Sequence, residues 1–225
     1  MNGSSRSWDV QRELWVGLRD YVVGGSCSPP FLSFDGAPKR RPMVMGSMDL
    51  SDTERDAYDT AIMWSESGAD GICIRLSSEG DAPMVAMICA VTGLPLILEG
   101  DPGAVSAAAS AVQDSVLILV GAESDGHVTV HCASSCDDAS GPGKDMVMFG
   151  YSVLGELKRY RSKGLKGDEC CKSPAIADIR GSTEDPLEEA MHGLEAMLCG
   201  ADMIVMSSSM AADMCRFQGE ELADL

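Results

Sequence analysis

The chain has 225 residues and a formal net charge of −18, from 35 acidic and 17 basic side chains, and 45% of its residues are hydrophobic. Its length and apolar content predict one globular domain with a full core and exclude a disordered chain. The acidity disfavours nucleic acid and anionic membranes as partners, because an acidic surface releases no counterions from them. No apolar run is long enough to span a bilayer and no secretion signal opens the sequence, so nine scattered cysteines indicate a reducing cytoplasm.

The first 30 residues form a predicted N-terminal helical extension, followed by a domain over residues 31–225. Val10, Leu14 and Leu18 fall on one helical face. The simpler interpretation is a helix that plugs the bottom of the domain. The alternative is a docking helix for a partner, with Trp8 and Trp15 as anchors.

From residue 42 onward, short apolar runs alternate with helical stretches. The runs predict strands at 42–49, 71–76, 94–100, 115–123, 127–132, 145–150, 174–181 and 201–209. Helices are predicted at 51–68, 80–93, 101–114, 151–164, 185–200 and from about residue 210. The helix at 51–68 has Ser51 as N-cap, Glu54 as the capping-box residue and Gly68 as its stop signal.

Gly-Ala-Asp occurs at 68–70 and again at 200–202, each time before an apolar run. This is the junction at which a helix ends on a left-handed glycine and the chain enters a buried strand. Seven or eight such strands predict either an α/β barrel or a doubly wound sheet. The strand count, and the lack of a glycine-rich nucleotide fingerprint after the first strand, favour a TIM-like (β/α) barrel.

The alternation weakens over residues 120–146, so we expect the barrel to be irregular or incomplete there. Only about five loop residues connect the apolar runs VLILV and HVTVHC, too few for an ordinary crossover helix. The spacing predicts an antiparallel hairpin and an open barrel beside residues 116–122. The gap would be covered by the loop at 133–144 or by a partner.

Function in such a barrel gathers where the strands end. The candidate ligand- or partner-facing residues at those ends are Asp49, Arg75, Glu99, Asp101, Glu123, Tyr151, Asp178, Arg180 and Ser207. Their carboxylates suit acid–base chemistry or the holding of an amide-bearing ring such as a pterin, although strand ends are also polar simply because they meet water. No catalytic constellation is recognisable. The cysteine clusters at 131–136 and 170–171 lack zinc-site spacing, so no metal is expected.

Several stretches, in order and spacing, carry a resemblance to a known family: residues 29–49, 64–76, 94–103, 148–169 and 173–214. Together they resemble the delta subunit of the archaeal acetyl-CoA decarbonylase/synthase complex, the small subunit of the corrinoid iron–sulfur protein. The resemblance implies a TIM barrel related to pterin-binding methyltransferase barrels. It also implies a heterodimer with a large subunit that carries the corrinoid and a [4Fe–4S] cluster.

The same resemblance implies that the chain binds no cofactor alone and meets the corrinoid at the subunit interface, in the methyl transfer of one-carbon metabolism and methanogenesis. The chain is shorter than members of that family, so the corrinoid-facing surface is expected to be remodelled. Three functions are open: a non-catalytic supporting subunit, a pterin-dependent methyltransferase that uses the strand-end carboxylates, and a diverged paralogue with a structural or regulatory role.

Overall fold

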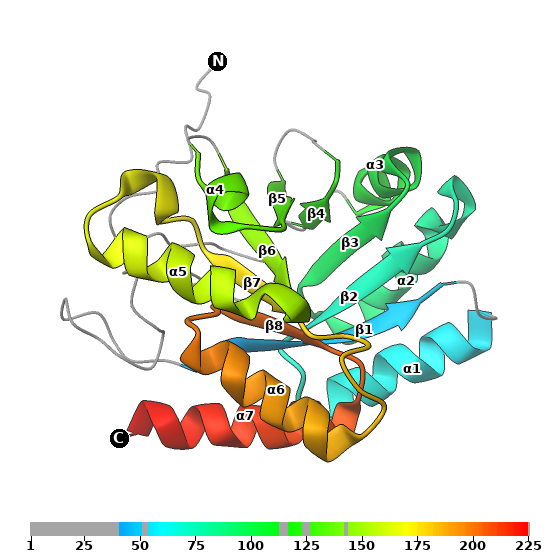
Figure 1. The fold of residues 1–225 in the computed structure, drawn as a ribbon. Coiled ribbons are helices and arrows are strands. Elements are labelled where there is room, and N and C mark those ends of the chain that lie inside the picture. Colours follow the sequence, from blue (N-terminus) through cyan, green and yellow to red (C-terminus); the bar gives the residue numbers. More distant parts are fainter. Residues whose placement is uncertain (1–40, 51–53, 113–116, 123–126, 142–143, 225) are drawn as a thin grey trace.

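A closed eight-stranded parallel barrel forms the centre of the protein (Figure 1). The computed structural model describes residues 41–50, 54–112, 117–122, 127–141 and 144–224. Each strand pairs with the next one along the chain, and β8 pairs with β1, which closes the sheet. The predicted TIM-like barrel is therefore confirmed. The predicted N-terminal helix and the Ser51 cap lie outside the described residues.

The strands and helices follow the predicted alternation closely. The strands are β1 Met43–Asp49, β2 Gly71–Leu76, β3 Leu96–Gly100, β4 Ile118–Val120, β5 Val128–Ala133, β6 Met146–Gly150, β7 Ala175–Asp178 and β8 Met203–Met206. The helices are α1 Glu54–Glu66, α2 Ala82–Thr92, α3 Pro102–Ala111, α4 Cys136–Ala139, α5 Leu154–Leu165, α6 Pro186–Leu198 and α7 Ser209–Asp224. Short 3₁₀ turns occur at Glu79–Asp81, Tyr151–Val153 and Glu169–Cys171. In the described residues, no helix is both long and apolar enough to cross a membrane.

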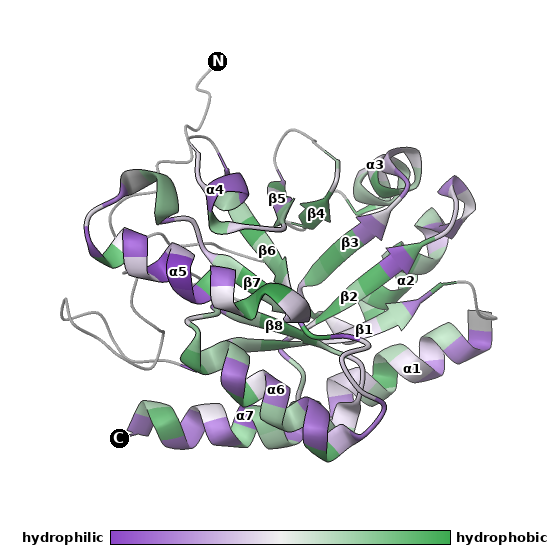
Figure 2. Cartoon of the chain, in the orientation of Figure 1, coloured by the Kyte–Doolittle hydropathy of each residue, from purple (hydrophilic) through white to green (hydrophobic). Residues whose placement is uncertain are grey.

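Two apolar clusters result from the alternation of side chains across the strands. The inner cluster fills the barrel with thirteen buried side chains, five of them methionines (Met43, Met45, Met146, Met148 and Met203). The outer cluster lies between the strands and the helices, whose polar residues face outward (Figure 2). Both faces of most strands are therefore apolar, which explains why the strands read as continuous apolar runs.

The repeated Gly-Ala-Asp stretches are two copies of one helix-to-strand junction. Gly68 and Gly200 adopt left-handed φ values of 78° and 97° after α1 and α6. The N–H group of the following alanine then reaches back five residues: Ala69 donates to Trp64 at 3.2 Å and Ala201 to Ala196 at 3.1 Å. This is the Schellman arrangement, which satisfies carbonyl groups that a helix end leaves free.

The aspartate of each junction ties the strand that it opens to a neighbouring strand. The carboxylate of Asp70 accepts the N–H of Val44 at 2.8 Å, and that of Asp202 accepts the N–H of Ala175 at 2.9 Å. Each aspartate donates its own N–H back to the carbonyl of the same partner at 2.8 Å. Arg41 pairs with Asp70 and Arg161 pairs with Asp202. A buried carboxylate requires such partners, so the motif fixes strand positions at the bottom of the barrel.

The predicted antiparallel hairpin and open edge beside β4 are wrong. β4 pairs in parallel with both β3 and β5, with Ile118 opposite Val128. A parallel link usually needs a dozen residues or more, yet residues 121–127 suffice here. The reason is that β4 has only three residues and rises roughly 10 Å, whereas seven residues reach up to roughly 23 Å.

The predicted irregularity of this region lies in the helical layer. Among the described residues no helix lies between β4 and β5, and α4, between β5 and β6, has only four residues. Part of the segment 133–144, expected to be a covering loop, forms α4 instead. The outward side chains Thr129 and His131 of β5 are partly exposed, so this part of the sheet meets solvent.

Candidate functional site

Six of the nine predicted strand-end residues meet at one mouth of the barrel. The register places Asp49, Arg75 and Glu99 side by side on β1, β2 and β3. Asp178 ends β7 and Arg180 follows it, while Ser207 follows β8. Because parallel strands all finish at the same end of a barrel, residues far apart in the sequence converge there.

Arg180 connects the carboxylates of this mouth. Its terminal nitrogens bond both oxygens of Glu99, Nη1 to Oε1 at 2.5 Å and Nη2 to Oε2 at 2.8 Å. Its Nε and Nη2 bond the two oxygens of Asp178 at 2.8 and 2.7 Å. Arg75 Nε adds a contact to Glu99 at 3.0 Å and lies 3.7 Å from Asp49. Five charged side chains therefore form one continuous ion-pair network across the mouth.

The pKa shifts in this network follow from its pairing. Burial alone would raise the pKa of Glu99, but the hydrogen bonds and positive charges of Arg180 and Arg75 outweigh burial and hold that pKa below its ordinary value. Burial likewise opposes the Arg180 cation, whereas its bonds to Asp178 and Glu99 raise its pKa. Both groups are therefore ionised at neutral pH.

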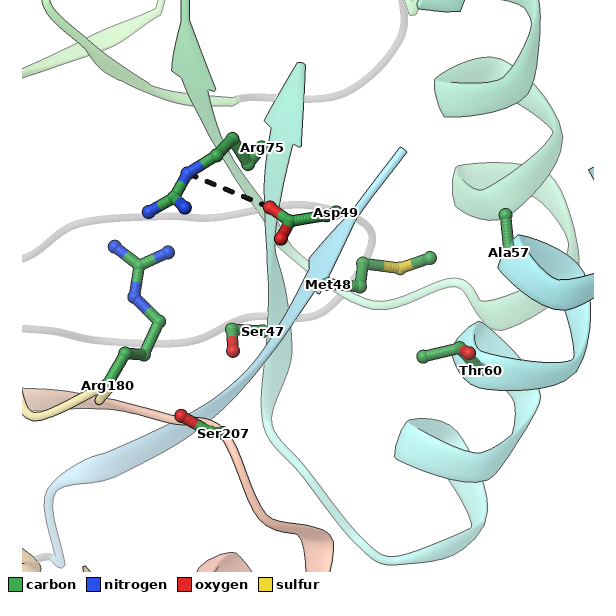
Figure 3. A pocket seen from close by; sticks show the side chains of 8 residues that line it. All are labelled: Ser47, Met48, Asp49, Ala57, Thr60, Arg75, Arg180 and Ser207. Atoms are coloured by element: carbon green, nitrogen blue, oxygen red, sulfur yellow. Dashed lines mark ion pairs between the residues drawn. The ribbon is translucent and has the colours of Figure 1, made fainter. Parts of the chain in front are cut away.

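A cavity of about 400 Å³ opens beside this network and is lined by Ser47, Met48, Asp49, Ala57, Thr60, Arg75, Arg180 and Ser207 (Figure 3). The side chains of Asp49 and Arg75 are 55% and 58% exposed, whereas those of Glu99 and Arg180 are 12% and 14% exposed. Asp49 and Arg75 are therefore the groups presented to a ligand, and Glu99 and Arg180 form the support behind them.

Three predicted site residues are not part of the mouth as described. Asp101 caps α3, since its carboxylate accepts the N–H of Gly103 at 2.9 Å. The ring of Tyr151 packs against His192 of α6, with centroids 4.1 Å apart. Glu123 lies outside the described residues. The first two therefore stabilise the fold locally.

Sequence reasoning missed three residues near this mouth. Ser47 lines the cavity, and its inward position follows from the period of two that also places Asp49 inside. Cys132 on β5 lies close enough to Glu99 and Asp178 for their charges to act on it. Burial first, and then those carboxylates, raise the pKa of its thiol. Glu189 on α6 is buried and bonds to Ser207 and Ser208; no local signal singled it out.

Two further observations concern a possible metal site and a second cavity. Among the described residues, no group of three or more His, Cys, Asp or Glu side chains is arranged to bind a metal ion. A second cavity of about 460 Å³ lies on the open part of the sheet, lined by Gly121, Ala122, Thr129, Val130, His131, Lys144 and Met146. It lacks the converging carboxylate–guanidinium network that marks the mouth.

Solved structures with a similar fold include dihydropteroate synthases. The enzyme from Thermus thermophilus, in complex with 6HMPPP, has a TM-score of 0.62 at 16% identity, over 94% of this chain and all of its own. The Stenotrophomonas maltophilia enzyme has a TM-score of 0.56 at 16% identity, over 80% of this chain and 93% of its own. The Anaplasma phagocytophilum enzyme, with bound 6-hydroxymethylpterin-monophosphate, has a TM-score of 0.59 at 8% identity, over 81% of this chain and 99% of its own.

No family model and no curated protein matches the sequence. At identities this low the structural likeness shows the fold alone, a barrel shared with pterin-binding enzymes. These findings give no support to the finer resemblance to a corrinoid-protein subunit.

Proposed function

We propose that this chain is a pterin-binding barrel of a group-transfer system, in which the mouth holds the pterin ring. The observation that carries the proposal is the exposed pair of Asp49 and Arg75 above a charge network that is otherwise fully paired. A pterin presents N–H donors at its amino group and N3, next to the carbonyl oxygen on C4. A carboxylate beside a guanidinium complements that edge.

Asp49 accepts hydrogen bonds from the ring, and Arg75 donates to its carbonyl oxygen. Glu99 contacts Arg75 at 3.0 Å and is itself held by Arg180, so the binding groups are oriented before the ligand arrives. The cavity of about 400 Å³ falls within the range of small-molecule sites. Ser47 and Ser207 add hydroxyl groups to its wall.

The described mouth orients a ligand but supplies no activated nucleophile. Glu99 has a lowered pKa and remains a carboxylate paired with Arg180, so it is a poor general acid. The raised pKa of Cys132 keeps its thiol protonated. The acceptor of a group carried on the pterin therefore comes from a second molecule. The sequence resemblance suggests the cobalt of a corrinoid-bearing partner subunit, which would make the chain part of a methyl-transfer complex.

The fold comparison supports the pterin over other flat ligands. Structures of dihydropteroate synthase with pterin derivatives bound share this barrel, although their low identity to this chain transfers no residue role. The alternative of a supporting subunit without a small-molecule site makes the opposite prediction about pterin binding. Direct measurement of binding therefore separates the two functions.

The proposal is tested by calorimetry of the full chain with 7,8-dihydropterin and with methyl-tetrahydropterin. We expect binding of at least one ring by the wild type. Asp49→Asn should weaken it roughly 10–100-fold, because it removes one or two charge-assisted hydrogen bonds. Asp224→Asn, at the far end of α7, is the matched control and should bind as the wild type does. An absence of binding heat at millimolar ligand, or equal losses in the two variants, would contradict the proposal.

A corrinoid-bearing partner is examined separately, by size-exclusion chromatography of the chain mixed with a cobalamin-containing large subunit. Co-elution at micromolar concentration is expected if the acceptor is that protein. Separate elution together with pterin binding would leave the pterin site standing and rule out this partner.

A further inference from the structure

The N-terminal end of α7 holds a carboxylate where barrels of this fold commonly bind phosphate. Phosphate sites in TIM barrels frequently use the loops after the seventh and eighth strands and a helix N-terminus. Here the two oxygens of Glu189 accept the N–H groups of Ser207 at 2.6 Å and Ser208 at 3.0 Å. Glu189 is only 2% exposed, so its carboxylate lies inside the fold.

Glu189 reaches this position from α6, eighteen residues before Ser207. The carboxylate compensates the positive end of α7, and the N–H groups of Ser207 and Ser208 compensate the buried charge. Ser207 also lines the mouth cavity. The backbone N–H group of Ser207, a residue of the cavity wall, and that of Ser208 are therefore already occupied by an anion of the chain.

The charge of the mouth also disfavours a bound phosphate. Among the residues that the structure describes, Asp49, Glu99 and Asp178 pair with two cations, Arg75 and Arg180. The described loops after β2, β7 and β8 (77–81, 179–185 and 207–208) contain four acidic residues, Glu79, Asp81, Glu184 and Asp185, and one basic residue, Arg180. A phosphate ester with two negative charges would therefore enter a mouth in which carboxylates outnumber cations, and the backbone N–H groups of Ser207 and Ser208 are not available to compensate it.

From these observations we infer that the mouth selects an unphosphorylated pterin, with Glu189 as the specificity-determining residue that excludes phosphate. The inference rests on the proposed pterin function and narrows its substrate class. The ring carries a neutral or cationic substituent, in contrast to the phosphorylated pterin named for the Anaplasma phagocytophilum enzyme.

The first test compares 6-hydroxymethyl-7,8-dihydropterin with its monophosphate by calorimetry on the full wild-type chain. We expect the alcohol to bind at least tenfold more tightly than the monophosphate, with the gap narrowing at high ionic strength because salt screens the repulsion. Equal or tighter binding of the monophosphate would overturn the inference and leave the proposed function intact. If neither compound binds, and 7,8-dihydropterin and methyl-tetrahydropterin also fail, the pterin function itself falls, and the inference falls with it.

The second test removes the internal carboxylate. Glu189→Ala should free the two N–H groups, so inorganic phosphate should raise the melting temperature of this variant in a concentration-dependent way. The wild type and Glu195→Ala, an exposed position on the same helix, should not respond. A variant that folds and ignores phosphate would contradict the role of Glu189. If the variant does not fold, the comparison of the two pterins on the wild type still decides the inference.

Discussion

Replacing Asp202 with Asn should destabilise the barrel much more than the same replacement of Asp70, although both occupy the same Gly-Ala-Asp junction. The difference lies in their arginine partners. The side chains of Asp202 and Arg161 are 1% and 4% exposed, whereas those of Asp70 and Arg41 are 8% and 22% exposed. Arg41 also lies 3.4 Å from Glu220.

Loss of the Asp202 charge leaves the Arg161 guanidinium buried without that carboxylate, which costs about 3–5 kcal/mol. Loss of the Asp70 charge costs about 1–2 kcal/mol, because Arg41 keeps both water and Glu220. Urea unfolding followed by circular dichroism measures both free energies of unfolding. Asp224→Asn is the control, with a change within about 0.5 kcal/mol.

The double variant Arg161→Met with Asp202→Asn should recover much of the loss, because it removes the buried cation together with the carboxylate that compensates it. Equal losses in the two single variants, or no recovery in the double variant, would refute the reasoning that burial of the partner sets the cost.

Gly46→Ala should lower the free energy of unfolding by about 1–3 kcal/mol or more, since the new methyl group would fall 2.1 Å from the buried indole of Trp64. Gly155→Ala, in open space on α5, should raise the free energy of unfolding by about 0.5–1 kcal/mol. Urea unfolding of both variants checks the two signs. Glu99→Gln should cost stability at neutral pH. Because pairing depresses the pKa of Glu99 below its ordinary 4.5, the wild type's advantage should hold above that pH and fade as the pH drops through the depressed value; a constant difference down to pH 2 would contradict this. Alkylation of the native chain near pH 8 should label the exposed Cys170 well before Cys171, because Cys171 is buried and its thiol pKa is raised to about 11. Mass spectrometry of early time points measures the order of labelling, and the reverse order would contradict the packing described.

The barrel was predictable because its local signals and its packing agree. Strands covered on both faces read as continuous apolar runs, and glycines such as Gly68 and Gly200 mark the helix ends. The path of the chain at β4 was not predictable from usual loop lengths, because β4 is unusually short. The sequence of β5 did contain a signal that one face of this strand meets solvent. Its apolar and polar residues alternate, as in Val128 and Thr129, which is typical of a strand with one face in water.

The candidate site was predictable in part, from the positions at which the strands end. The rule that strand ends converge identified Asp49, Arg75, Glu99 and Arg180, but it does not state which face a side chain takes. The inward residues of β6 are Met146 and Met148, so Tyr151 falls outside the barrel and meets α6 instead. Glu189 was beyond sequence reasoning, since its contact with Ser207 joins two elements through space.

The short link between β4 and β5 also has a consequence for the order in which the barrel assembles. Ile118 pairs with Val128 ten positions later, and Val130 pairs with Met146 sixteen positions later, whereas Met45 and Gly71 on β1 and β2 are 26 positions apart. Closing a loop of 10 rather than 26 residues costs roughly 0.8 kcal/mol less in chain entropy. β4, β5 and β6 are therefore the most local part of a sheet whose remaining pairings are distant, and we expect them to nucleate folding. Substitutions in these strands should slow refolding, whereas substitutions at the β1–β8 seam should mainly speed unfolding.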